Sequence, residues 1–140
     1  MRRLRVRGVL LCAIAALAGA CGSTTPTTPT TPTLVTDTFT GTLAQNGGVT
    51  HQFTIGAAGT ITATLTSVGP DSTKTVGFSL GIVIGTACQA VLANDAAVQT
   101  KSLSSSAQLG GSGFCVRVYD VGSITADTGP FTYTVTVTHP

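Results

Sequence analysis

Threonine alternates with apolar residues in three long segments of this chain, and no other feature restricts its fold as strongly. The segments are 38–43 (TFTGTL), 60–66 (TITATLT) and 131–138 (FTYTVTVT). Successive side chains of a β-strand point to opposite faces, so a period of two predicts strands with one buried face. Threonine is β-branched and suits the exposed face. The pattern predicts sheets that bury their apolar side and present threonine to solvent.

Turn-forming residues separate these segments at short intervals. Glycine, proline and asparagine cluster at 46–48 (NGG), 69–71 (GPD) and 129–130 (GP), and no segment has the 3.6-residue period of a helix. Short strands spaced by such turns are typical of an antiparallel sandwich, for which about 105 residues is a usual size. We therefore expect residues 34–140 to form a single all-β antiparallel β-sandwich.

The most apolar internal run, 77–93 (GFSLGIVIGTACQAVLA), has two interpretations. A membrane span is one, although the run contains several glycines and Gln89 and is shorter than the roughly 20 residues that a helix needs to cross a bilayer. Two buried strands joined at Gly85-Thr86 are the other. The turn residues inside the run favour two strands.

The N-terminus has the pattern of an export signal. Four arginines in the first seven residues precede 13 uncharged residues, 8–20, which are too few to cross a bilayer. The sequence 17–21 (LAGAC) resembles the bacterial lipobox, and that resemblance implies cleavage after residue 20 and a lipid on Cys21. It departs from the family pattern at Ala18, where leucine is usual. Ordinary secretion after an A-x-A cleavage site is the alternative.

A threonine–proline repeat, TTPTTPTTPT, occupies residues 24–33. Proline at every third position favours polyproline II, and at ~3.1 Å per residue the segment 22–33 would extend roughly 37 Å. We therefore expect the lipidated cysteine and linker, 21–33, to hold a domain away from a membrane surface. Gly22 replaces the aspartate that signals inner-membrane retention in enterobacteria, which favours the outer membrane or the cell surface.

Counting the cysteines predicts a disulfide. Cys12 lies in the signal peptide and Cys21 is the lipid site, so Cys88 and Cys115 remain in the exported domain. An oxidising compartment favours their pairing. A free thiol or a pair of metal ligands is the alternative, but neither cysteine has a second ligand close by in the sequence.

Charge and residue types exclude several functions. Without the signal peptide the chain has three cations and five aspartates, a formal charge of −2, so it lacks the basic patch that nucleic-acid binding needs. It contains no glutamate, no G-x-S-x-G motif and no P-loop. We interpret Asp120 and Asp127 as turn caps and His51 as a solvent-facing residue at a strand edge. No catalytic residue and no cofactor is expected.

Arg117 and Tyr119 are the best binding candidates in the chain. By strand periodicity they share a face with Cys115, opposite the face of Phe114, Val116 and Val118. If that face is open, the two side chains can contact a ligand. The alternative is an arginine that lies over the disulfide and the aromatic ring.

The strand pattern also resembles the bacterial pre-peptidase C-terminal domain family, a jelly-roll-like β-sandwich of secreted and surface proteins. The matching segments are 39–43 (FTGTL), 52–55 (QFTI), 59–61 (GTI), 78–82 (FSLGI), 113–119 (GFCVRVY) and 133–137 (YTVTV). Immunoglobulin-like and CUB-like sandwiches are alternatives with a similar pattern. Some family members bind calcium through carboxylates near the domain start, but residues 48–53 (GVTHQF) contain none, so no metal site is carried over.

Together these features predict a noncatalytic lipoprotein of the cell envelope. Its sandwich would be a binding module for envelope proteins or glycans. The alternative is a structural or assembly protein that self-associates through exposed strand edges, which only Lys74 and Lys101 could protect. An enzyme is the third hypothesis.

Overall fold

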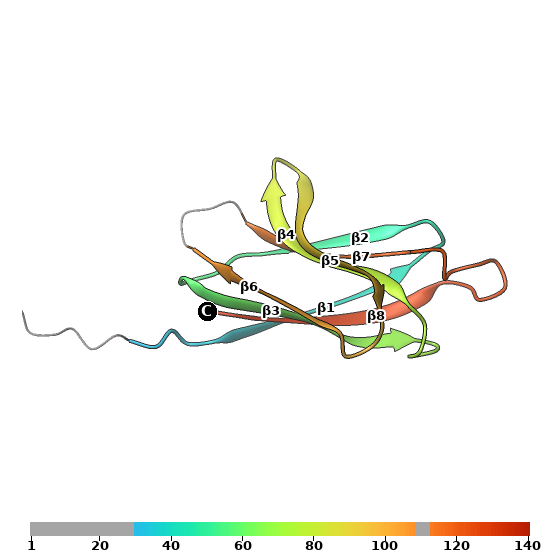
Figure 1. Ribbon diagram of the computed structural model, residues 1–140, viewed down its shortest axis with the longest axis horizontal. Coiled ribbons are helices and arrows are strands. Elements are labelled where there is room, and N and C mark those ends of the chain that lie inside the picture. Colours follow the sequence, from blue (N-terminus) through green and yellow to red (C-terminus); the bar gives the residue numbers. More distant parts are fainter. Residues whose placement is uncertain (1–29, 109–112) are drawn as a thin grey trace, which may run out of the picture. The chain divides into compact units, whose positions relative to one another are not determined.

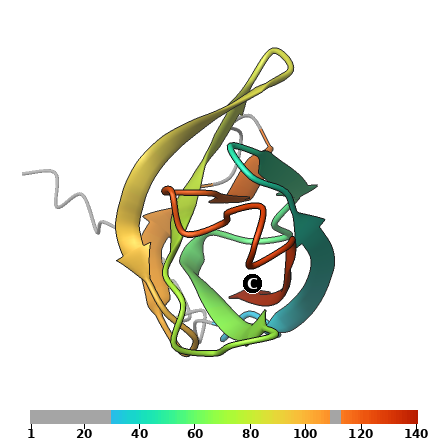
Figure 2. The same cartoon turned by 90° about the vertical axis from the view of Figure 1, so that its right-hand side faces the viewer.

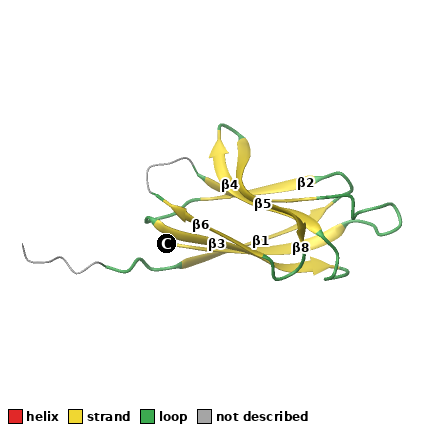
Figure 3. Ribbon diagram, viewed as in Figure 1, coloured by secondary structure: helices red, strands yellow, loops and turns green. Residues whose placement is uncertain are grey.

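The fold is taken from a computed structural model that describes residues 30–108 and 113–140. The expected signal peptide, Cys21 and most of the linker lie outside the described residues. Residues 31–140 form one compact unit. The described residues contain no helix and eight strands (Figures 1 and 3): β1 Val35–Leu43, β2 Gly48–Phe53, β3 Gly59–Gly69, β4 Val76–Ile84, β5 Ala87–Ala97, β6 Ser102–Ala107, β7 Phe114–Tyr119 and β8 Phe131–His139.

The strands form two antiparallel four-stranded sheets, and Figure 2 shows them wrapped around a common interior. Their orders are β1-β8-β3-β6 and β2-β7-β4-β5. Only the β4–β5 connection stays within one sheet, whereas every other connection crosses from one sheet to the other. This is the strand order of a double-sheet jelly roll. The predicted all-β sandwich and its jelly-roll-like character are confirmed.

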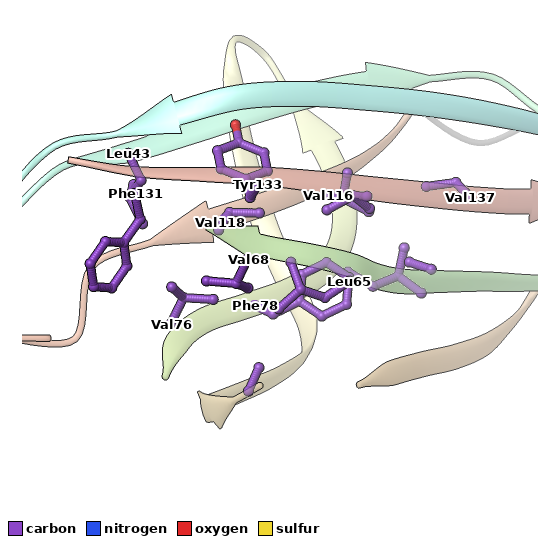
Figure 4. Close-up of a cluster of buried hydrophobic side chains, with 14 of the residues drawn as sticks. Leu43, Leu65, Val68, Val76, Phe78, Val116, Val118, Phe131, Tyr133 and Val137 are labelled. Atoms are coloured by element: carbon purple, nitrogen blue, oxygen red, sulfur yellow. The ribbon is translucent and has the colours of Figure 1, made fainter. Parts of the chain in front are cut away.

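The alternating segments form strands with one buried face, as the sequence predicts. Along β8, Phe131, Tyr133, Val135 and Val137 are each at most 2% exposed. Buried apolar side chains of β3, β4 and β7 pack against these residues between the two sheets (Figure 4). Burying one such side chain contributes about 1.5–3 kcal/mol, so this interior is the main source of stability.

Hydroxyl side chains cover the outer face of the β1-β8-β3-β6 sheet. Register places the threonines of β1, β8 and β3 and the serines of β6 side by side on this face. Hydroxyls of neighbouring strands are hydrogen-bonded, at 2.8 Å between Thr64 and Ser102 and at 3.0 Å between Thr62 and Ser104. Such cross-strand pairs contribute about 0.2–1 kcal/mol each. The predicted threonine surface is therefore part of the sheet's stability.

The apolar run 77–93 forms two strands, as expected, but only the first of them is buried. Residues 76–81 of β4 are buried, whereas Val91 of β5 is 57% exposed. The prediction of two buried strands is thus wrong for β5, because β5 is the edge of its sheet. Gly85 takes a φ of 63° at the connecting turn. No helix among the described residues is long and apolar enough to span a membrane.

The β4–β5 hairpin curls strongly, and its tip rises from the sheet in Figure 1. The pairing shifts where Leu80 faces Leu92 and Gly81 faces Ala90, so Val91 is the additional residue of a β-bulge. At this bulge β5 passes directly over Gly81. A Cβ at Gly81 would lie 2.7 Å from the carbonyl carbon of Gln89 and 2.9 Å from Cα of Ala90. The backbone approach therefore requires glycine at position 81.

Candidate functional site

The outer face of the β2-β7-β4-β5 sheet holds Arg117 and Tyr119 on β7. Val116 precedes Arg117, and Val118 lies between Arg117 and Tyr119. Both valines are fully buried in the core, so the predicted division of the two faces of β7 is confirmed. The Arg117 guanidinium carbon lies 5.3 Å from the centre of the Tyr119 ring. The Tyr119 hydroxyl donates a hydrogen bond to Asp95 Oδ1 of β5. Contacts within β7 and with β5 thus fix the position of Tyr119.

Small residues of β4 lie beneath the pair. Gly77 faces Tyr119 and Ser79 faces Arg117 in the register. A Cβ at Gly77 would occupy the same space as the Tyr119 ring, and Ser79 is only 3% exposed. Tyr119 therefore lies flat across β4. Arg117 covers the aromatic ring, as the alternative interpretation expected, and it is also exposed to solvent, as a binding residue must be.

The electrostatics leave the guanidinium available to a ligand. The hydrogen bond to Asp95, followed by burial and the Asp95 charge, raises the pKa of Tyr119, so its hydroxyl remains a donor. Among the described residues, no carboxylate lies within ion-pair distance of Arg117. Thr50 faces Arg117 across β2, and Gln52 next to it is also exposed. This polar group of side chains suits a carboxylate or several hydroxyls.

Cys88 and Cys115 form the predicted disulfide, with 5.9 Å between their Cα atoms. The bond joins β5 to β7, which lie on either side of β4 in the sheet. The disulfide can extend from β5 across β4 to β7 because β5 curls over Gly81. The alternatives of a free thiol and of a metal-ligand pair are therefore wrong for these two residues.

His51 is not the solvent-facing residue that we expected. It is half-buried on the inner side of β2, stacked on Phe39 with ring centres 4.9 Å apart. Its Nε2 is hydrogen-bonded to the Tyr133 hydroxyl at 2.8 Å. Figure 4 shows that hydroxyl directed out of the apolar cluster. The edge position of β2 is as expected, but the side chain points between the sheets.

A second histidine lies in the same layer and was missed as a site residue. His139 is 4% exposed, and its Nε2 donates a hydrogen bond of 3.1 Å to Asp37 Oδ2. Its ring stacks on Phe53 with centres 5.4 Å apart. The sequence could have indicated this, because position 139 continues the alternation by which every second side chain of β8 points inward. In the described part of the chain, no three histidine, cysteine or acidic side chains gather as metal ligands.

Asp120 is a turn cap, as predicted. Its carboxylate accepts hydrogen bonds from the backbone N–H groups of Asn46, Gly122, Ser123 and Ile124, at 2.8–3.1 Å. Burial acts to raise the pKa of Asp120, but these four hydrogen bonds outweigh it and lower the pKa below its usual value. The carboxylate is thus held ionised by the loop that it organises.

We expect His51→Gln to weaken the dependence of stability on pH. Burial lowers the pKa of His51 below 6.5 in the folded protein. The unfolded chain therefore binds the proton more readily, and folding stability falls as the pH decreases from about 7 to about 5. Glutamine does not titrate, so urea unfolding across this range should show a smaller loss in the variant. Equal losses in both proteins would contradict the prediction, whatever other groups titrate, because those groups are shared.

Comparison with known proteins gives structural matches only, since no protein-family model and no curated protein matches the sequence. The mitogen of Yersinia pseudotuberculosis has a similar structure, with a TM-score of 0.55 and 18% identity over 76% of this chain and 86% of the mitogen. A periplasmic inhibitor of g-type lysozyme from Aeromonas hydrophila gives a TM-score of 0.48 and 16% identity, over 74% of this chain and 84% of the inhibitor. The likeness to the mitogen shows a shared fold.

Proposed function

We propose that this protein is a noncatalytic lipoprotein of the cell envelope whose β-sandwich binds an envelope protein or a glycan. The observation that carries the proposal is the exposed Arg117 guanidinium, held over Tyr119 on a rigid sheet with no carboxylate partner among the described residues. An arginine held in this way loses little conformational freedom on binding. Such a group suits recognition of a carboxylate or of sugar hydroxyls.

The same proposal includes a lipid anchor on Cys21 and a location at the outer membrane or the cell surface. The lipobox-like sequence and the threonine–proline linker support it. Mass spectrometry of the membrane-extracted protein tests the anchor. The expected product begins at Cys21 and carries a diacylglyceryl group. An unmodified chain that begins at another residue would contradict the anchor and leave the binding site untouched.

Affinity capture from crosslinked cell envelopes tests the binding function, with bound proteins and glycans both analysed. Loss of a charge-assisted hydrogen bond costs about 1.5–3 kcal/mol, so Arg117→Ala should reduce recovery of the ligand at least about tenfold. Lys101→Ala is the matched control, because it removes an exposed cation from the turn between β5 and β6. Equal recovery with all three proteins would reject Arg117 as the binding residue.

Assembly through strand edges is a second candidate function. Its specific support is β5, an eleven-residue edge strand that carries no charge from Ala87 to Asn94. Unprotected edges of this kind pair with other strands. Sedimentation over a range of concentrations separates the two functions, because a monomer throughout excludes self-association.

A further inference from the structure

An apolar slit opens between the two sheets, on the side where the edge strands β5 and β6 lie. It has a volume of about 120 Å³. Ile61 and Leu80 form its floor and are 1% and 2% exposed. Ile82, Val91, Ser105 and Phe114 also line it. Among the described residues that line it, none is charged, and neither Arg117 nor Tyr119 contributes to it.

The size of the slit restricts what can occupy it. An apolar cavity of about 150 Å³ is large enough to bind benzene and stays free of water. A slit of 120 Å³ therefore suits one branched aliphatic side chain and is too small for the acyl chain of a lipid. A charged group of a ligand would find no partner in this lining, and burying an unpaired charge is strongly unfavourable, so the occupant must be uncharged.

The strand beside the slit can bind the backbone of such a ligand. β6 pairs with β3 in regular register from Ser102 to Ala107, and no strand of the described residues pairs with its other edge. The bulge at Val91 makes β5 a less regular edge. Along β6, Leu103, Ser105 and Ala107 point inward, whereas Ser102, Ser104 and Ser106 point outward. A strand added to β6 would therefore place every second side chain toward the slit.

We propose that this is a binding site for an extended peptide segment of a partner protein, which adds to the free edge of β6 and inserts a leucine, isoleucine or valine side chain into the slit. In this mode the backbone hydrogen bonds give affinity and the pocket gives specificity. The outward residues of the peptide would lie beside the hydroxyl face of the β1-β8-β3-β6 sheet, so the geometry selects a segment that alternates polar and aliphatic residues. The site is separate from Arg117, and the two proposals stand or fall independently.

The test uses the exported chain with Cys21→Ser, which keeps it free of lipid, and a synthetic peptide of the same six-residue length as β6. The peptide alternates serine with leucine, and a matched peptide has aspartate in place of the central leucine. NMR titration should shift the amide signals of β6 and of Ile82 and Val91. Burial of one leucine side chain corresponds to about thirtyfold in affinity, which is the expected difference between the two peptides.

Two variants of β6 make the test specific. Ser105→Leu fills the slit from within and should reduce peptide affinity about thirtyfold, while the added burial keeps the domain folded. Ser104→Leu adds the same side chain to the outer face of the same strand and should leave affinity nearly unchanged. Equal binding to both variants would overturn the proposal, as would equal affinity for both peptides. Signals of β6 that shift with protein concentration alone would assign the edge to a second copy and also overturn it.

Discussion

Replacing Gly81 with alanine is expected to lower the free energy of unfolding by about 3 kcal/mol or more, which places it among the most destabilising single substitutions in this domain. The new Cβ would overlap the backbone of Gln89 and Ala90, where β5 crosses over β4. A flexible side chain could move aside, but this backbone is held by the hairpin and by the disulfide at Cys88. The clash can be relieved only if the bulge opens.

Urea unfolding of the sandwich domain measures this effect, and Gly56→Ala is its control. Gly56 lies in a loop with a φ outside the left-handed region, and the nearest atom to its new Cβ would be 3.9 Å away. Alanine there should be neutral or should stabilise slightly, because it reduces the freedom of the unfolded chain. A loss below about 1 kcal/mol for Gly81→Ala would show that β5 does not pass over β4 as described.

Much of the fold follows from local pattern, and the exceptions have physical causes. The period of two locates β1, β3 and β8 because each has one buried and one exposed face. β4 does not alternate, because Tyr119 and the backbone of β5 cover its outer face as well. Its continuous apolar sequence is the result. β5 resembles β4 in composition, but an edge position depends on topology, which the local sequence does not encode.

Some features of the candidate site could also be predicted from the sequence, and others could not. Counting the cysteines predicts Cys88–Cys115, and the strand period places Arg117 and Tyr119 on one face. The contact of Tyr119 with Asp95 was not predictable, since it joins residues that are 24 positions apart in the sequence and depends on a bulge in β5. His139 was predictable from the strand period. It was missed because polar residues are usually exposed, and here Asp37 satisfies its hydrogen bond.

Hydroxyl groups make the outer face of the β1-β8-β3-β6 sheet polar. Neighbouring threonines and serines satisfy one another on this sheet and remain accessible to water. On the edge strand β1, Asp37 points inward, and a charged residue in that position disfavours pairing with another strand.

Removing the disulfide should have the second large effect. Cys88→Ala together with Cys115→Ala is expected to lower the free energy of unfolding by about 3.5 kcal/mol, since the unfolded chain is no longer restrained by a loop of 27 residues. The melting temperature should fall by about 15 °C. Domains of this size are usually stable by only about 5–15 kcal/mol, so the bond supplies a large fraction of the total.

Reduction of the unaltered protein provides the matched comparison. A reductant should lower its stability to nearly that of the double variant, and should leave the double variant unchanged. Because Cys115 is fully buried, the unfolded protein must be present for complete reduction, and urea unfolding with and without reductant meets that condition. The bond also holds the β4–β5 hairpin in its curl over Gly81. We therefore expect Gly81→Ala to cost less in the double variant than in the oxidised protein, because the opened hairpin can then move away from the new methyl group.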